Sequence, residues 1–327
     1  MASMTRTLVM FLALFISVFA AGTTAALAQT WPQKPVRVVV GNTAGSLSDV
    51  LARQIFAKLS QSLGQQFIID NRAGAGGAIG AESVARSAPD GYAFLFGTDG
   101  MMVINPFVYS KLAYDTLRDF ASVSMLAKIP YVLMVNSSFA AKSLEDFIGA
   151  AKARPGQINY SSGGNGHATH LEMELIARKA GIELVHVPYK GTGPALQAVI
   201  SGEVAATAIG LGIALPHIAA GKVRALAIGG PRAKDLLPRV PDLVSVLPDA
   251  EYVSWQALFA PAGTPVPIID RLNAELVRAL HLPEIQKQLA DVGMAGVGSS
   301  PAELDRVLRA DLATNRELVK ALGLKLD

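Results

Sequence analysis

The chain has 327 residues, a formal net charge of +3 and no cysteine. So small a net charge gives no electrostatic footprint for nucleic acid, and we exclude nucleic acid as a partner. The absence of cysteine excludes disulfides, thiol catalysis and thiolate metal sites, whereas the length allows two domains with cores of their own.

Residues 1–28 have the pattern of a secretory signal peptide. Arg6 supplies a positive charge, an apolar run follows from Leu8 to Ala21, and the segment ends in the A-x-A cleavage site Ala26-Leu27-Ala28. The apolar run is short for a membrane span. We therefore predict export to the periplasm, with cleavage after Ala28.

The next part of the chain alternates between strand-like and helical patterns. Apolar runs at 36–40, 66–70 and 93–97 are typical of strands buried on both faces, and amphipathic segments follow the first two. Strand–helix–strand alternation favours parallel sheets covered by helices.

The alternation then begins again. Strand-like runs lie at 131–135, 158–160, 184–189, 204–210 and 223–229, and a last apolar run at 253–261 leads into C-terminal helices. Two α/β units whose C-terminal segment returns to the first predict an α/β, two-lobed fold with a ligand cleft between the lobes. We expect residues 29–128 plus 254–327 in the first lobe and 129–253 in the second.

Glycine- and serine-rich loops stand at three strand-to-helix junctions, 41–49, 71–80 and 161–167. Ligands of open α/β sheets bind where the carboxyl ends of strands meet helix N-termini. Such N-termini offer unpaired N–H groups and a positive dipole end, and glycine lets an anion come close. The loops are candidate carboxylate sites, although turns and helix caps account for the glycines equally well.

Motifs for catalysis or metal binding are weak. The chain has no P-loop and no G-x-S-x-G motif, and Gly74, Gly76 and Gly80 match a dinucleotide loop only loosely. His167, His170 and Glu174 fall on one helical face, but their spacing fits no zinc-protease motif. We expect no cofactor and no metal. The enzymatic alternative is a periplasmic hydrolase or lyase that uses His167, His170 and Asp99.

Longer motifs follow one another along the whole mature chain. They include "WPQKPVRVVV", "NRAGAGGAIGAESVARSAPDGY", "SSGGNG" with "HLEME", "HVPYKGTGPAL" and "LFAPAGTP". In these motifs the chain resembles the periplasmic solute-binding receptors of tripartite tricarboxylate transporters, often called Bug-type receptors. The resemblance implies a Venus-flytrap (periplasmic-binding-protein) fold without catalysis, which closes on a small carboxylate ligand. It further implies a monomer whose partners are two membrane transporter subunits or a sensor protein.

The resemblance also implies that one loop from each lobe grips a ligand carboxylate. The implied ligand-binding residues are Thr43, Ala44, Gly45 and Ser46 in the first lobe and Ser162, Gly163, Gly164, Asn165, Gly166 and His167 in the second, and we also expect Thr98 to bind ligand. Asp49 and Arg53 are expected to form an i, i+4 pair that organises the first loop.

Three positions depart from the family's pattern. Ser46 stands where glycine is usual, His167 stands where Ser or Thr is usual, and Gly210 stands where many members have Asp. From Gly210 and His167 we predict an acid without an ammonium group, bound in part by His167. The imidazole of His167 is expected to be neutral in the empty protein and to be favoured in its protonated form by a bound carboxylate. Two alternatives are that His167 only caps its helix, and that the receptor has lost its small ligand and serves in signalling.

Overall fold

The computed structural model describes residues 31–230, 232–248, 250 and 253–325. The predicted signal peptide lies outside these residues, so its cleavage stays a prediction. Within the described ranges no helix is both long enough and apolar enough to cross a membrane.

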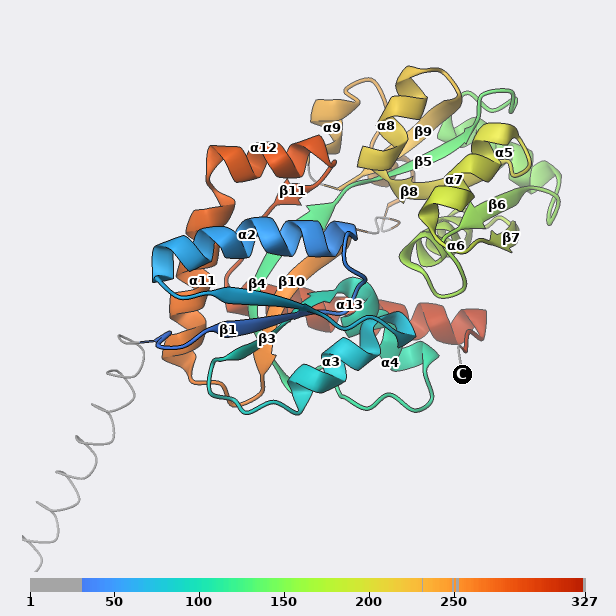
Figure 1. Cartoon of the computed structure of the whole chain (residues 1–327). Helices are drawn as coiled ribbons and strands as arrows, with labels where there is room; N and C mark the ends of the chain where they lie inside the picture. Colours follow the sequence, from blue (N-terminus) through green and yellow to red (C-terminus); the bar gives the residue numbers. More distant parts are fainter. Residues whose placement is uncertain (1–30, 231, 249, 251–252, 326–327) are drawn as a thin grey trace, which may run out of the picture.

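The chain folds into two α/β lobes, each built on its own sheet (Figure 1). The first sheet has the strand order β11-β4-β10-β3-β1-β2. Its strands are β1 (Val36–Val40), β2 (Phe67–Asn71), β3 (Ala93–Thr98), β4 (Phe120–Ile129), β10 (Ser254–Pro261) and β11 (Ala295–Gly296). The predicted parallel pairing is confirmed for β1 with β2 and β3. The last apolar run, β10, runs antiparallel to β3 and β4.

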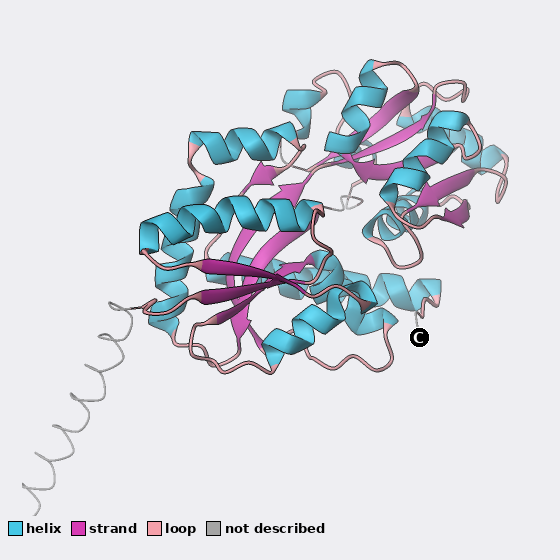
Figure 2. Ribbon diagram, in the orientation of Figure 1, coloured by secondary structure: helices cyan, strands magenta, loops and turns pink. Residues whose placement is uncertain are grey.

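Helices cover both faces of the first sheet (Figure 2). One face packs against α2 (Leu47–Leu63), α11 (Val266–Leu280) and α12 (Pro283–Asp291), and the other against α3 (Ala78–Ala85), α4 (Asn105–Val108) and α13 (Pro301–Leu322). The apolar runs predicted as strands form the middle of this core. Val36, Val38, Val39 and Val40 of β1, for example, are fully buried.

The second sheet has the strand order β7-β6-β8-β5-β9. Its strands are β5 (Tyr131–Asn136), β6 (Asn159–Ser162), β7 (Val185–Pro188), β8 (Ala206–Gly210) and β9 (Val223–Gly229). Helices α5 (Leu144–Ala153), α6 (Ala168–Ala180) and α10 (Leu243–Val246) cover one face, and α7 (Thr192–Ser201), α8 (Leu211–Ala219) and α9 (Ala233–Leu236) cover the other. Here β6 is parallel to β7 and β8, whereas β5 is antiparallel to β8 and β9.

The chain crosses between the sheets at two places. Pro130 alone separates β4 from β5, and β10 begins at Ser254 after the chain leaves the second sheet. We propose that the lobes divide at these crossings, as 29–128 plus 254–327 and 129–253.

Two side-by-side contacts join the lobes beyond these crossings. Leu171 and Leu175 of α6 share an apolar cluster with α13, which ends beneath the second lobe (Figure 1). On another side Gly212 meets the turn at Val292 and Gly293, where a Cβ atom on Gly212 would lie 2.3 Å from the Val292 carbonyl oxygen. A close backbone approach of this kind requires glycine.

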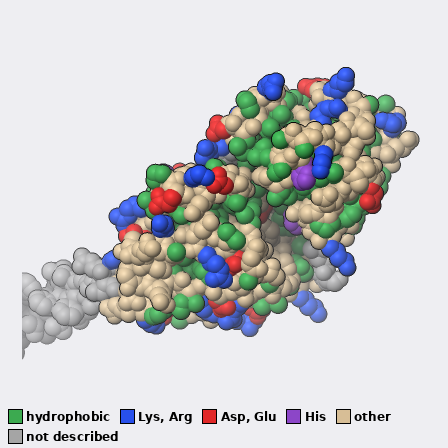
Figure 3. Space-filling view, turned by 45° about the horizontal axis from the view of Figure 1, so that its top comes forward, with side chains coloured by type: hydrophobic (Ala, Val, Ile, Leu, Met, Phe, Trp, Pro, Cys, Tyr) green, Lys and Arg blue, Asp and Glu red, His purple; other side chains and the backbone are tan. Residues whose placement is uncertain are grey.

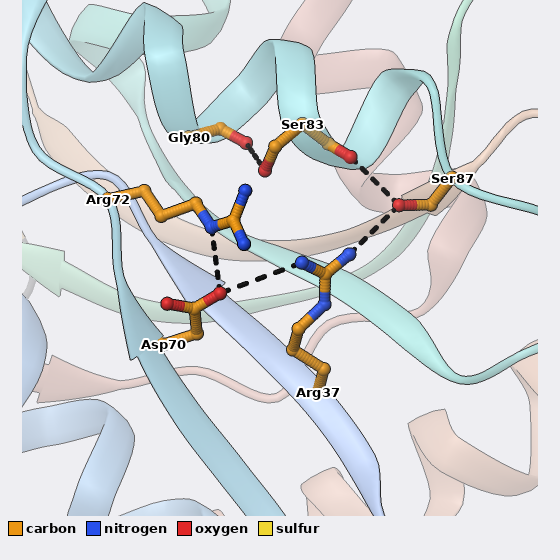
Figure 4. Close-up of polar contacts among 6 residues, drawn as sticks. All are labelled: Arg37, Asp70, Arg72, Gly80, Ser83 and Ser87. Atoms are coloured by element: carbon orange, nitrogen blue, oxygen red, sulfur yellow. Dashed lines mark hydrogen bonds and ion pairs between the residues drawn. The ribbon is translucent and has the colours of Figure 1, made fainter.

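A polar cluster on the first lobe fixes α3 to the sheet (Figure 4). Asp70 of β2 lies between two guanidinium groups, with its Oδ2 atom 2.8 Å from Nε of Arg72 and 3.6 Å from the nearer nitrogen of Arg37. Arg37 also donates to Oγ of Ser87, just after α3, over 3.1 Å. These charges have one another as partners, so we assign the cluster a structural role in holding the glycine-rich loop at 71–80.

Candidate functional site

A cavity of about 600 Å³ lies between the lobes. The space-filling view shows the surface hollowed at this place (Figure 3). Its lining includes Asn42, Ser46, Leu47, Ser48, Gly76, Thr98, Asp99, Gly100, Asn105, Tyr109, Ile129, Tyr131, Asn165, Gly166, His167, Ala168, Thr169, Thr192, Gly210, Gly212, Ile213, Ser254, Gln256 and Val292. Both lobes contribute, and so do residues from both crossings.

The electrostatic character of the cavity comes from helix ends. Among the described residues that line it there is no lysine and no arginine. Four helices instead begin at its wall, α2 from the first lobe and α6, α7 and α8 from the second. The N-terminus of each helix carries a partial positive charge and N–H groups without helical partners. The cavity therefore suits an anion that is held by neutral donors.

The first-lobe loop is held in place by a charged pair behind it. The buried Asp49 carboxylate accepts from the backbone N–H of Gly45 over 2.8 Å, and Arg53 binds the same carboxylate. Arg53 also donates to Asn71 at the end of β2. The hydrogen bond from Arg53 is the main cause that lowers the pKa of Asp49. The predicted Asp49–Arg53 pair is therefore confirmed, and it ties the loop to the neighbouring strand.

The second-lobe loop, residues 162–167, is held by two histidines. Nδ1 of His170 accepts from the backbone N–H of Gly166 over 3.1 Å. Nε2 of His186 lies 2.6 Å from Oγ of Ser162, which in turn accepts from the N–H of Gly164. The two imidazole rings stack with centroids 3.8 Å apart. Both ends of the loop thus depend on one stacked pair.

Burial keeps this histidine pair neutral. Desolvation lowers the pKa of His170 to about 3 and that of His186 to about 4. Beside the pair, the Tyr160 hydroxyl donates to Glu174, which also lies 4.0 Å from Nε2 of His170. The neutral state is required by the geometry, because a protonated Nδ1 of His170 could not accept from Gly166.

His167 is the N-cap of α6. Its Nδ1 accepts from the backbone N–H of Thr169 over 3.2 Å and lies 3.0 Å from the Thr169 hydroxyl. A neutral His167 therefore carries its proton on Nε2. His167 is an exposed residue in the cavity lining, and desolvation lowers the pKa of its ring. The capping role is observed, whereas donation from Nε2 to a ligand stays a prediction.

The architecture matches that of known receptors. Residues 51–324 match the family model described as the tripartite tricarboxylate transporter family receptor. The chain belongs to this family.

The receptor has relatives and structural neighbours of similar length. It is 33% identical to the protein BugT of Bordetella pertussis, over 91% of this chain and 92% of BugT. The solved structure of Rpa4515 from R. palustris with adipate shares 35% identity and a TM-score of 0.76, over 90% of this chain and 99% of that one. MatC from Rhodopseudomonas palustris, with bound malate, shares 32% identity and a TM-score of 0.73, over 88% and 100%. The receptor is thus of the Bug type, with the two-lobed periplasmic-binding-protein fold.

The structure brings part of the predicted site to the cavity of this receptor. Ser46 and Thr98 line it from the first lobe, and Asn165, Gly166 and His167 line it from the second. The other six predicted residues are not part of this lining. In the first lobe, Thr43, Ala44 and Gly45 are exposed in the turn before α2. In the second lobe, Ser162 is buried, and Gly163 and Gly164 are half-buried. Those six shape the loops, and contact between them and a ligand stays a prediction.

Sequence reasoning missed several lining residues of the receptor. Asn42 lies in the glycine-rich loop 41–49, and Thr192 begins α7, so the sequence contained a signal for both. Tyr131, Ser254 and Gln256 come from the crossings between the lobes, where no loop motif marks them. Asp99 also lines the cavity and supplies a carboxyl group there, so Gly210 alone does not decide whether the ligand carries an ammonium group.

Of the residues named for an enzyme, His167 and Asp99 line the cavity of the receptor, whereas His170 does not. Among the described residues no group of three or more His, Asp or Glu side chains is arranged to hold a metal. His170 is buried against His186 behind the loop, whereas Asp99 accepts from Ser254 across the cavity floor. The comparisons give the hydrolase or lyase alternative no support.

Proposed function

We propose that the protein is a periplasmic receptor that captures a small organic carboxylate between its lobes without chemical turnover. The observation that carries this proposal is the convergence of four helix N-termini on one cavity whose described lining has no cationic side chain. Backbone N–H groups and dipoles hold a carboxylate without a counter-ion.

The relatives support the ligand class. One structural neighbour holds adipate and another holds malate, which are small acids of the size that a cavity of about 600 Å³ admits. We propose that Ser46 and Thr98 on one side and Asn165, Gly166 and His167 on the other contact the carboxylate of this chain's ligand.

The family supports the partners. We propose that the closed, loaded receptor delivers its ligand as a monomer to two membrane subunits of a tripartite tricarboxylate-type transporter, or to a sensor protein. Export and signal cleavage after Ala28 belong to the same proposal, because such a receptor works outside the inner membrane.

Titration calorimetry on the purified mature protein tests the proposal. The probes are malate, succinate, adipate and citrate, with mass spectrometry of the recovered acid to detect any conversion. We expect stoichiometric binding of at least one acid and its recovery unchanged. Conversion of a bound acid would contradict the receptor function, and so would the failure of every carboxylate to bind.

A further inference from the structure

A second groove lies on the first lobe, outside the cleft between the lobes. It has a volume of about 500 Å³ and runs between α13 and the segment 106–117, beside α4 (Figure 1). Its described lining shares no residue with that of the ligand cavity. Helix α4 separates the two, because its Asn105 lines the cavity and its Phe107 lines the groove. We call this surface the α13 groove and define it by Phe107, Leu117, Arg309, Leu312 and Arg316.

The α13 groove is preformed, because hydrogen bonds fix the segment that borders it. The buried hydroxyl groups of Tyr114 and Thr116 donate to the backbone carbonyls of Met101 and Met102. The carboxylate of Asp115, which is the one acid in the described lining, accepts from two backbone N–H groups of the turn that follows it. A surface held in this way needs little further ordering when a partner binds to it.

The floor of the groove is apolar. Phe107, Leu112 and Leu312 are half-buried there and pack against the apolar cluster that includes α13. Leu117 also lines the groove and is 42% exposed. Apolar side chains that gather in one groove with polar residues around them are typical of sites where another protein binds.

Two guanidinium groups border this floor. Arg309 and Arg316 are both exposed and stand seven residues apart, which places them on one face of α13. Arg309 binds Asp305. Arg316 lies over the Phe107 ring, with its Cζ atom 5.6 Å from the ring centroid, and forms no ion pair with any residue that the structure describes. An arginine without a counter-ion next to an aromatic ring suits a partner that brings a carboxylate.

We propose that the α13 groove docks an acidic segment of a membrane subunit of the transporter, with an apolar side chain on Phe107 and a carboxylate on Arg316. The proposal rests on the proposed function, which supplies the membrane subunits as partners. The exposed edge of the groove favours a protein segment over a free small acid, because a small-molecule site buries most of its ligand. Its concave floor differs from an anchor in a lipid surface, which needs apolar side chains that project outward.

Uptake by cells tests the docking surface. Cells of the bacterium that encodes the protein, with the gene deleted, receive the parent, Arg316→Glu or Arg306→Glu. The labelled probe is whichever of malate, succinate, adipate and citrate binds most tightly by calorimetry. Arg306 is exposed on α13 outside the groove, so its variant carries the same change of charge. We expect Arg316→Glu to bind the acid as the parent does and to lower uptake about tenfold, and Arg306→Glu to change neither.

The outcomes of the uptake experiment separate the proposals. Parental uptake with Arg316→Glu would overturn the docking site and leave the receptor function intact. A loss of acid binding as large as the loss of uptake would give Arg316 a structural role and would also overturn the docking site. Uptake that does not depend on the parent protein would contradict the transporter partner of the proposed function, and the docking proposal with it.

Photocrosslinking in the same cells identifies the occupant. Benzoylphenylalanine replaces Leu117 in the groove or, as the control, Val266 at the start of α11, which is 66% exposed and lies outside the groove. We expect position 117, and not position 266, to crosslink to a segment of a membrane subunit that contains Asp or Glu, identified by mass spectrometry. A crosslink to phospholipid or to a second copy of this chain, equal crosslinks from both positions, or none from position 117 would overturn the assignment.

Discussion

The two loops that face each other across the cavity have the same position relative to a helix, but different side chains stabilise them. Each precedes a helix whose N-terminus points to the cavity. The first loop is fixed by a buried carboxylate and an arginine, Asp49 and Arg53, and the second by the neutral imidazoles of His170 and His186. The charged pair Asp49–Arg53 and the neutral pair His170–His186 respond differently to substitution and to pH. Experiments can therefore distinguish the contribution of the first loop from that of the second.

The largest expected effect is the loss of the second-lobe loop in Gly166→Val. Gly166 has φ +70°, and its N–H donates to His170, so a β-branched residue costs about 1–2 kcal/mol of strain and displaces the loop. We expect affinity for the best carboxylate to fall on the order of a hundredfold, measured by calorimetry, because hydrogen bonds to a charged ligand are lost.

The matched control for this variant is Gly156→Val. Gly156 has nearly the same conformation, φ +65°, with open space around it and no place in the cavity lining. It should lose a similar amount of stability and keep its affinity. Equal loss of affinity in both variants would show that strain alone, and not the loop, controls binding.

The next effect concerns the charged support. In Asp49→Asn an amide oxygen still accepts from Gly45, but the pairing of Arg53 with a buried carboxylate is lost. We expect the free energy of unfolding to fall by about 1–3 kcal/mol and affinity to fall about tenfold. Asp305→Asn, which breaks an exposed i, i+4 pair with Arg309, should change either quantity only slightly. Equal effects of the two substitutions would argue against a support role for Asp49.

Acid should weaken the second loop before the first. Unfolded histidine binds a proton near pH 6.5, whereas folding holds the pKa of His186 at about 4 and that of His170 at about 3. The unfolded state therefore gains protons first, and stability is lost as pH falls from about 6.5 toward 4 and then 3. The pKa of Asp49 is lowered, so its contribution is lost only below about pH 4.

Thermal melts between pH 7 and 4.5 measure this difference. The parent melting temperature should drop by several degrees, and the double variant His170→Asn, His186→Gln should show a flatter profile. The charged or titratable neighbours of the pair, His167, Glu174 and Tyr160, are unchanged in it. His281→Asn removes an exposed histidine far from the loop and should keep the parent slope. A double variant as acid-sensitive as the parent would locate the titration elsewhere.

The smallest effect concerns how the two loops are brought together. Gly212→Ala places a methyl group against the Val292 carbonyl and should keep the lobes slightly apart. We expect affinity for the ligand to fall about threefold. We also expect small-angle scattering to give the ligand-bound variant a larger radius of gyration than the ligand-bound parent. Gly149→Ala in α5, which has open space around it, is the control. An unchanged radius of gyration in Gly212→Ala would mean that this contact does not limit closure.

The sequence alone determined the local pieces of this receptor. Continuous valine runs such as Val36–Val40 become buried strands because both faces of the sheet are covered. Glycine-rich stretches become strand-to-helix loops because only glycine accepts φ +70° at Gly166 or φ +81° at Gly45 without strain. The Asp49–Arg53 pair follows from i, i+4 spacing on one helix.

The tertiary structure decided which of these segments pair and pack against one another. β4 was not recognised from sequence, and the reversed direction of β10 depends on the path of the chain through the second lobe. The cavity lining joins Asn42, Asp99 and Gln256, which the sheet order makes neighbours although most of the chain separates the first from the last. The histidine pair depends in the same way on β7 lying beside β6. A local sequence pattern does not predict such long-range pairings. The strand order is selected by packing and hydrogen bonds between segments that lie far apart in the sequence.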